Sequence, residues 1–364
     1  MFGSRNFLFA RKAGAAGNKL FLWGKNTNGQ LGQGNTTSVS SPVQVGSLAE
    51  WSKVGTENIT IATKSSGQLW SWGSGYAGQL GLGNTTSYSS PKQIGALTNW
   101  LTPIIGTSNV ICIKTDGTLW AWGSGTYGTL GLGNTTSYSS PKQIGSSTNW
   151  VSISAEYGVL AVDSAGKLFA WGNNAKGQLG LGDLTNRSSP VQVGALTNWA
   201  KPAAGSQHSL CVKTDGTLWS WGFGSYGALG SGNTTSRSSP VQVGSLTNWA
   251  TPSASRYSSV CVKTDGTLWA WGKNQYGQLG LGNLTSYSSP KQVGALTNWL
   301  QPTINTGSTI CSKTDGTLWA WGQNNYGQLG LGNLTSYSSP KQVGALTGWS
   351  NPDRAGSTSG CVQS

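Results

Sequence analysis

Short runs of mixed apolar and polar residues recur along the chain, each bounded by Gly, Asn, Ser or Pro. In one well-formed unit they are the segment after Trp249 and residues 260–263, 267–271 and 290–293. Such runs are typical of short strands joined by tight turns. Asp265-Gly266 lies between the second and third runs, and this dipeptide favours a two-residue hairpin turn. The pattern therefore predicts an all-β chain with four strands per unit.

A Trp-Gly dipeptide marks each unit and recurs every 49 or 50 residues. The tryptophans are Trp23, Trp72, Trp122, Trp171, Trp221, Trp271 and Trp321. A four-stranded unit repeated at a fixed period is the signature of a propeller blade. Seven copies predict a seven-bladed β-propeller of four-stranded blades.

The two ends of the chain predict how the ring closes. The first Trp-Gly comes so early that its unit lacks two strands, and the missing pair lies at the other end. There, Trp349 occupies the position of Trp299, and Cys361 that of Cys311. We therefore expect a blade shared between N- and C-terminal strands, with its N-terminal part beginning near Lys19. This closure removes the open edges that a partial propeller would expose. The predicted domains are an N-terminal arm (1–16) and the propeller (17–364).

The repeat carries a family resemblance. Residues 271–282 and 321–332 both read Trp-Gly-x-Asn-x-x-Gly-Gln-Leu-Gly-x-Gly, which resembles the repeat of the regulator of chromosome condensation family. The resemblance implies a seven-bladed propeller of a family in which some members act as nucleotide exchange factors for small GTPases and many are interaction platforms. The exchange-factor branch has longer insertions, for which units of this length leave no room. Fold transfers across such a resemblance better than function does.

Composition narrows the partner classes. The chain has 55 Gly, 19 Trp, 9% charged residues and a net charge of +13. Such a positive charge makes nucleic acid a candidate partner. However, the lysines recur at fixed repeat positions around the ring, such as Lys114, Lys213, Lys263 and Lys313, and form no stripe along a duplex. This spread argues against nucleic acid. No apolar run has the length of a membrane span.

Candidate chemistry is sparse. The tryptophans fall at three repeat positions, as core residues would. The five cysteines share one repeat position, where Ala62 and Ala161 stand in two other blades, so we interpret them as small buried residues rather than disulfides. His208 is the only histidine, and no Cys-x-x-Cys or His pair indicates a metal. The ten acidic residues are mostly repeat equivalents and offer no catalytic pair. We predict no enzyme activity, cofactor or metal.

The seven copies differ most in two loops, one after Trp-Gly and one between the first and second strands. In an antiparallel four-stranded blade both loops emerge on the same face, so the sequence predicts one varied and one monotonous face. Tyr and Arg are favoured binding anchors. The candidate binding residues on the varied face are Tyr127, Tyr157, Lys176, Tyr226, Arg256, Tyr257, Tyr276 and Tyr326. Neutral drift in loops is the competing explanation.

Our first functional hypothesis is a virion or surface attachment protein, found in a phage particle or at a cell surface. Its partners would be proteins of a larger assembly, with a cell-surface glycan or receptor as a further class. The hypothesis rests on near-identical repeats, a surface poor in charge, and a basic and aromatic arm that would dock to the assembly. The arm residues are Phe2, Arg5, Phe7, Phe9, Arg11 and Lys12. The alternatives are a cytoplasmic regulator or interaction scaffold and a carbohydrate-binding propeller.

Overall fold

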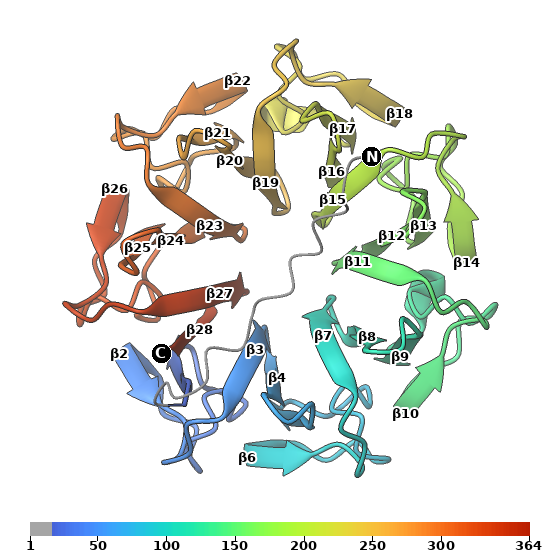
Figure 1. Cartoon of the computed structure of the whole chain (residues 1–364). Coiled ribbons are helices and arrows are strands. Elements are labelled where there is room, and N and C mark those ends of the chain that lie inside the picture. Colours follow the sequence, from blue (N-terminus) through green and yellow to red (C-terminus); the bar gives the residue numbers. More distant parts are fainter. Residues whose placement is uncertain (1–16) are drawn as a thin grey trace, which may run out of the picture.

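The computed structural model describes residues 17–364, the side chains of residues 354 and 355 excepted. They form seven four-stranded antiparallel sheets arranged as blades around a central axis (Figure 1). The predicted seven-bladed propeller of four-stranded blades is confirmed. Within the described residues, no helix is long and apolar enough to cross a membrane. The arm residues Phe2, Arg5, Phe7, Phe9, Arg11 and Lys12 lie outside the described residues.

Each blade begins with the strand nearest the axis and ends with the strand at the rim (Figure 1). The first strands are β3 (Trp51–Thr56), β7 (Trp100–Ile105), β11 (Trp150–Ala155), β15 (Trp199–Ala204), β19 (Trp249–Ala254), β23 (Trp299–Ile304) and β27 (Trp349–Ala355). The second strands are β4 (Ile59–Lys64), β8 (Asn109–Lys114), β12 (Gly158–Asp163), β16 (His208–Lys213), β20 (Ser258–Lys263), β24 (Ser308–Lys313) and β28 (Thr358–Gln363). The third strands are β1 (Lys19–Gly24), β5 (Leu69–Gly73), β9 (Leu119–Gly123), β13 (Leu168–Gly172), β17 (Leu218–Gly222), β21 (Leu268–Gly272) and β25 (Leu318–Gly322). The fourth strands are β2 (Val39–Gln44), β6 (Tyr88–Gln93), β10 (Tyr138–Gln143), β14 (Arg187–Gln192), β18 (Arg237–Gln242), β22 (Tyr287–Gln292) and β26 (Tyr337–Gln342).

We name the blades A to G. Blade A consists of β27, β28, β1 and β2; blades B to G follow in chain order from β3–β6 to β23–β26. Two short 3-10 turns, η1 (Thr126–Gly128) and η2 (Ser225–Gly227), lie in the long loops of blades C and E.

Blade A closes the ring as the sequence predicted. Strand β1 pairs antiparallel with β28, so that Leu20 lies opposite Val362 and Phe21 opposite Cys361. In Figure 1 the blue β2 and the red β27 form the two ends of this blade. The first and last described segments therefore hold each other in one sheet.

The tryptophans of the Trp-Gly dipeptides join neighbouring blades. All seven side chains are fully buried. Each indole Nε1 donates a hydrogen bond to a backbone carbonyl in the long loop of the preceding blade, at 2.8–3.1 Å. Burying one such ring removes about 150–250 Å² from water, worth on the order of 4–6 kcal/mol as an upper estimate. The core thus lies between the blades.

The five cysteines are free and buried. Cys311, for example, packs with Val260, Leu268 and Trp321 between blades F and G. Burial raises the pKa of each thiol, and that of Cys211 and Cys261 to about 12. This confirms the prediction that the cysteines fill small spaces in the core and form no disulfides.

The turn between the second and third strands differs from the prediction. In blade F the Lys263 N–H bonds to the Thr267 carbonyl, which leaves the three residues 264–266 in the loop. Gly266 has φ +77°, and the Asp265 carboxylate accepts the Thr267 N–H at 2.9 Å. A turn ending in a left-handed glycine gives this three-residue hairpin loop. The two-residue turn was therefore the wrong interpretation of Asp-Gly.

Five tryptophans two residues before Trp-Gly are half-buried, and a lysine lies on each. In blade C, Lys114 Nζ lies 3.7 Å from the Trp120 ring centroid and 4.5 Å from that of Trp100. Aromatic faces attract cations in this geometry. The lysines at this repeat position therefore pack against rings, which explains their regular spacing.

Candidate functional site

The two variable loops lie on one face of the ring. In blade B, Thr56 pairs with Thr60, Ile59 with Gly73, and Gly73 with Tyr88, so the first–second loop and the third–fourth loop share one end of the sheet. The prediction of one varied face is confirmed. We call this end of all seven blades the varied face.

Blades E and F meet on the varied face in a group of aromatic and cationic side chains. The rings of Tyr226 and Tyr257 have centroids 5.4 Å apart. Lys273 Nζ lies 4.9 Å from the Tyr226 ring and 5.3 Å from the Tyr257 ring. Arg256 lies over the Tyr257 ring at 5.0 Å. Tyr226 is 47% exposed, so the group is presented to solvent.

The group extends toward blade D. The Phe223 ring is 6.0 Å from that of Tyr257, and Lys176 Nζ lies 5.4 Å from the Phe223 ring. We call Lys176, Phe223, Tyr226, Arg256, Tyr257 and Lys273 the E/F cluster. The structure thus brings together four predicted residues and adds Phe223 and Lys273.

Tyr226 has an unusual backbone, with φ +60°. The equivalent Tyr127 of blade C has φ +61°. A left-handed conformation costs a residue with a side chain about 1–2 kcal/mol. Tyr276 and Tyr326 stand at the same repeat position. Neither of them has a positive φ. The backbone difference therefore does not come from tyrosine itself.

A glutamine two residues later accounts for the difference. In five blades its Oε1 accepts the N–H of the residue at the tyrosine position, at 2.8–3.0 Å; the pairs are Asn28 with Gln30, Ala77 with Gln79, Lys176 with Gln178, Tyr276 with Gln278, and Tyr326 with Gln328. In blades C and E this glutamine is replaced by Thr129 and Ala228. Without the glutamine acceptor, the turn adopts the 3-10 form and Tyr226 takes positive φ.

The backbone after Tyr226 is fixed from below. The Ala228 carbonyl accepts hydrogen bonds from Trp271 Nε1 and Ser259 Oγ, both at 2.9 Å. Ser259 Oγ in turn lies 2.8 Å from His208 Nε2. Burial lowers the pKa of His208 to about 4, so the ring is neutral. His208 and Ser259 are both fully buried, so the pair has a structural role and does not face a substrate.

The other predicted residues lie at different seams of the varied face. Tyr326 is exposed beneath Lys25, whose Nζ is 5.6 Å from its ring. Tyr276 is exposed between blades F and G, and Tyr127 and Tyr157 are exposed between blades C and D. Among the described residues, no ring pair joins Tyr127 to Tyr157. The eight candidates therefore do not form one continuous patch.

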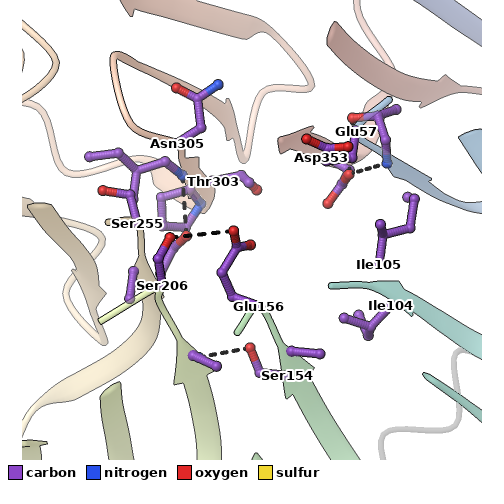
Figure 2. Close-up of a pocket in the computed structure, with 18 of the residues that line it drawn as sticks. Glu57, Ile104, Ile105, Ser154, Glu156, Ser206, Ser255, Thr303, Asn305 and Asp353 are labelled. Atoms are coloured by element: carbon purple, nitrogen blue, oxygen red, sulfur yellow. Dashed lines mark hydrogen bonds between the residues drawn. The ribbon is translucent and has the colours of Figure 1, made fainter. Parts of the chain in front are cut away.

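A cavity of about 430 Å³ opens along the axis and is lined by the ends of the first strands and the loops that follow them. Three carboxylates line it: Glu57, Glu156 and Asp353. Figure 2 shows Glu156 extending into the cavity, with Glu57 and Asp353 on its other side. Ser206 Oγ donates to Glu156 at 3.4 Å, and Asp353 accepts the Thr56 N–H at 2.6 Å.

The cavity is locally acidic in a basic protein. Burial, together with the negative charges of Glu57 and Asp353, raises the pKa of Glu156 to about 7. Burial also raises the pKa of Glu57. Within residues 17–364, no three His, Cys, Asp or Glu side chains are placed to hold one metal ion. The cavity can instead receive a positively charged side chain.

Shallow pockets recur at the rim. The pocket between blades F and G has a volume of about 370 Å³ and is lined by Trp299, Trp319, Gln292 and the exposed Leu296. Similar pockets of about 360–500 Å³ lie at three other blade junctions. Their indole and amide groups are suited to contacts with a sugar.

Sequence reasoning missed the cavity carboxylates and the role of Ala228. Glu57 and Glu156 stand at one repeat position, as the first residue of the loop between the first and second strands. This shared position was a signal that both side chains lie in the same part of the ring. The loss of glutamine at Thr129 and Ala228 was also visible. The effect of this replacement depends on the hydrogen bond from the tyrosine N–H to the glutamine Oε1, which the sequence does not show.

Comparison with known proteins identifies the repeat. The sequence profile described as "Regulator of chromosome condensation (RCC1) repeat" matches residues 18–56, 66–110, 116–157, 165–212, 215–262, 265–310 and 315–350. These matches cover most of the chain. A search of curated protein sequences found no significant match.

Solved structures share the fold at low sequence identity. Yeast RCC1 (Prp20) bound to Kap60 aligns with a TM-score of 0.84 and 18% identity over 95% of this chain and 88% of that one. Human WBSCR16 aligns with a TM-score of 0.84 and 18% identity, over 95% and 98%. Prp20p from Saccharomyces cerevisiae, described with its binding to Gsp1p and histones, gives 0.83 and 19%, over 96% and 92%. At these identities the likeness shows the fold alone.

Proposed function

The chain belongs to the regulator of chromosome condensation (RCC1) repeat family, and on that premise we propose that it is a non-catalytic binding propeller whose varied face receives a protein partner. The observation that carries the proposal is the E/F cluster. An exposed tyrosine ring beside a half-buried one, with a cation lying over both at the seam of two blades, has the composition of a binding anchor. One of those rings is held at a backbone angle that costs free energy, and such strain concentrates at functional positions.

Among the functional hypotheses, an intracellular regulator or interaction scaffold has the most support. The similar yeast protein Prp20 is described as bound to Kap60 and as binding Gsp1p and histones. The virion hypothesis gains nothing from these matches, and its docking arm lies outside the described residues. It stays an untested prediction.

The test blocks one face at a time. All five native cysteines are buried, so a single introduced cysteine can be coupled to a polyethylene glycol maleimide. Tyr276→Cys places the polymer on the varied face of blade F, and Leu296→Cys places it at the opposite end of the same blade; both side chains are exposed. Binding is measured by interferometry with purified Gsp1p, with histones and with proteins recovered from the source cells.

We expect a bound protein to be lost when the varied face is blocked and retained when the opposite end is blocked. The two uncoupled cysteine variants serve as matched controls for the substitutions themselves. Loss of binding only from the Leu296 position would overturn the assignment of the face. Retention by both coupled forms would show that neither end of the ring contacts that partner.

The rim pockets favour a second candidate, the binding of carbohydrate. Trp319 is half-buried beside one pocket, so an occupying sugar should change tryptophan fluorescence. A glycan array screened with the native protein and with Trp319→Ala tests whether this pocket binds carbohydrate. Equal binding of every glycan by both forms would refute a site in this pocket.

A further inference from the structure

We propose that the E/F cluster is a docking site for an acidic segment of the partner protein. This inference rests on the proposed function and deepens it by naming the chemistry of the partner. Carboxylates of the segment would pair with the three cations of the cluster. An aromatic or apolar side chain beside them would stack on Tyr226 and Tyr257.

Charge complementarity selects an acidic occupant. Lys176, Arg256 and Lys273 lie over aromatic rings. In the part of the chain that the structure describes, the ion pairs are Lys64 with Glu50 and Arg187 with Asp183, so these three cations have no carboxylate partner. A cation already held against a ring has lost part of its side-chain freedom. A carboxylate can therefore pair with it at a lower entropic cost than with a free lysine.

The adjacent cavity favours a short acidic protein segment over a nucleic acid. Arg256 belongs to the E/F cluster and also lines the axial cavity, so the two features adjoin. Glu57, Glu156 and Asp353 line the same cavity (Figure 2). A phosphate backbone carries a charge at every nucleotide and would meet these carboxylates as it left the cluster. A protein segment can place its acidic residues over the cluster and a basic residue at the cavity.

Ala228 is the positioning residue of the site. With alanine there, no side-chain amide accepts the Tyr226 N–H, and the ring lies 5.4 Å from Tyr257. Blades F and G show the alternative, because Tyr276 and Tyr326 bond to a glutamine and carry ordinary φ. Ala228→Gln should therefore turn Tyr226 away from Tyr257 without removing any ring or charge. It separates the geometry of the cluster from its composition.

The probe is a short fluorescein-labelled peptide of Glu and Phe, measured by fluorescence anisotropy with the full chain. The same peptide with Gln in place of Glu, and an oligodeoxythymidine, are the comparison ligands. We expect saturable binding of the acidic peptide that weakens as salt is raised. Tyr226→Ala and Tyr257→Ala should each weaken it roughly tenfold, and Lys273→Gln roughly fivefold. Ala228→Gln should weaken it several-fold.

Tyr76→Ala is the matched control, because Tyr76 is exposed on the same face between blades B and C, away from the cluster. It should leave peptide affinity unchanged. Thermal unfolding of each variant, followed by tryptophan fluorescence, establishes that the ring is intact. A variant that unfolds early is replaced by Tyr226→Leu or Tyr257→Leu, which keep apolar volume but remove the aromatic face.

Three results would overturn the proposal. They are absence of saturable binding by the acidic peptide, equal binding by the Gln-substituted peptide, and tighter binding of the oligonucleotide. Equal affinity of the folded Tyr226 and Tyr76 variants would place the site elsewhere on the ring. The proposed function stands after such a failure if polymer at Tyr276→Cys still abolishes the binding of a protein partner. If polymer on the varied face leaves that binding unchanged, the proposed function itself is refuted.

Discussion

The stability of the ring should depend on pH through Glu156. Its pKa is about 7 in the folded protein, against 4.5 for an ordinary glutamate, because burial and two neighbouring carboxylates oppose ionisation. The folded state therefore binds this proton more tightly than the unfolded chain. It follows that the contribution of Glu156 to stability is fully present below pH 4.5 and is lost as the pH rises through about 7.

The full difference in pKa corresponds to about 3 kcal/mol. Solvent reaches part of the side chain and screens its charge, so we expect about 1–2 kcal/mol. Glu156→Gln keeps the shape of the side chain and removes the ionisation. The variant should match the native protein near pH 4.5 and exceed its unfolding free energy by that amount at pH 8. Glu57→Gln should move the midpoint of this change to lower pH, because it removes one of the opposing charges.

Urea denaturation followed by tryptophan fluorescence at a series of pH values measures the effect. His208 contributes in the opposite direction, because its lowered pKa of about 4 makes stability fall as pH decreases from 6.5 toward 4. Native protein and variant both carry His208, so its contribution cancels in their difference. Glu50→Gln is the control, since it removes an exposed carboxylate that pairs with Lys64 and lies outside the axial cavity. If Glu156→Gln were less stable than the native protein at pH 8, the reasoning would be refuted, because the ionised carboxylate would then be stabilised by a cation such as Arg256.

Three further predictions concern the ring itself. The five cysteines should not react with Ellman's reagent in the folded protein and should all react after denaturation, because burial raises their pKa; a reactive native thiol would contradict this packing. Gly280→Ala should destabilise the chain by about 2 kcal/mol or more in urea denaturation, since Gly280 has φ +74° and the added Cβ would lie 2.6 Å from Trp321 Nε1; Gly294→Ala has a similar φ but open space around it, so it should cost only the backbone strain. Removing residues 358–364 should open blade A and lower the thermal midpoint, because β1 loses its partner β28, and an unchanged midpoint would show that this shared blade does not hold the ring closed.

The repeat made most of the fold predictable, because seven aligned copies show which positions are constant and how the ends complement each other. The spacing of Trp23 and the place of Trp349 were enough to predict a shared blade. The hairpin loop was misjudged because Asp265 and Gly266 suit two loop lengths, and the choice depends on which backbone groups pair.

The candidate site was harder to predict, for a different physical reason. Alternation of strands showed which loops share a face, but not which side chains meet across a seam. Tyr226 and Tyr257 are 31 positions apart in the chain and come from different blades, and they meet only after the ring is assembled. The strain in Tyr226 came from a residue that is absent, the glutamine replaced by Ala228. The cavity carboxylates come from blades A, B and D, so they lie around one cavity only when these blades are arranged about the axis.

The hydrogen bonds between blades have a consequence for how the ring tolerates change. At every seam the indole of the Trp-Gly dipeptide bonds to a backbone carbonyl, which belongs to Gln in five blades, to Thr129 in one and to Ala228 in another. A carbonyl is present whatever the side chain, so the joint does not constrain the residue that supplies it. Each blade can therefore exchange the side chains of its third–fourth loop while remaining joined to its neighbour. Substitutions in one of these loops can thus change the surface at one seam and leave the joints of the ring intact.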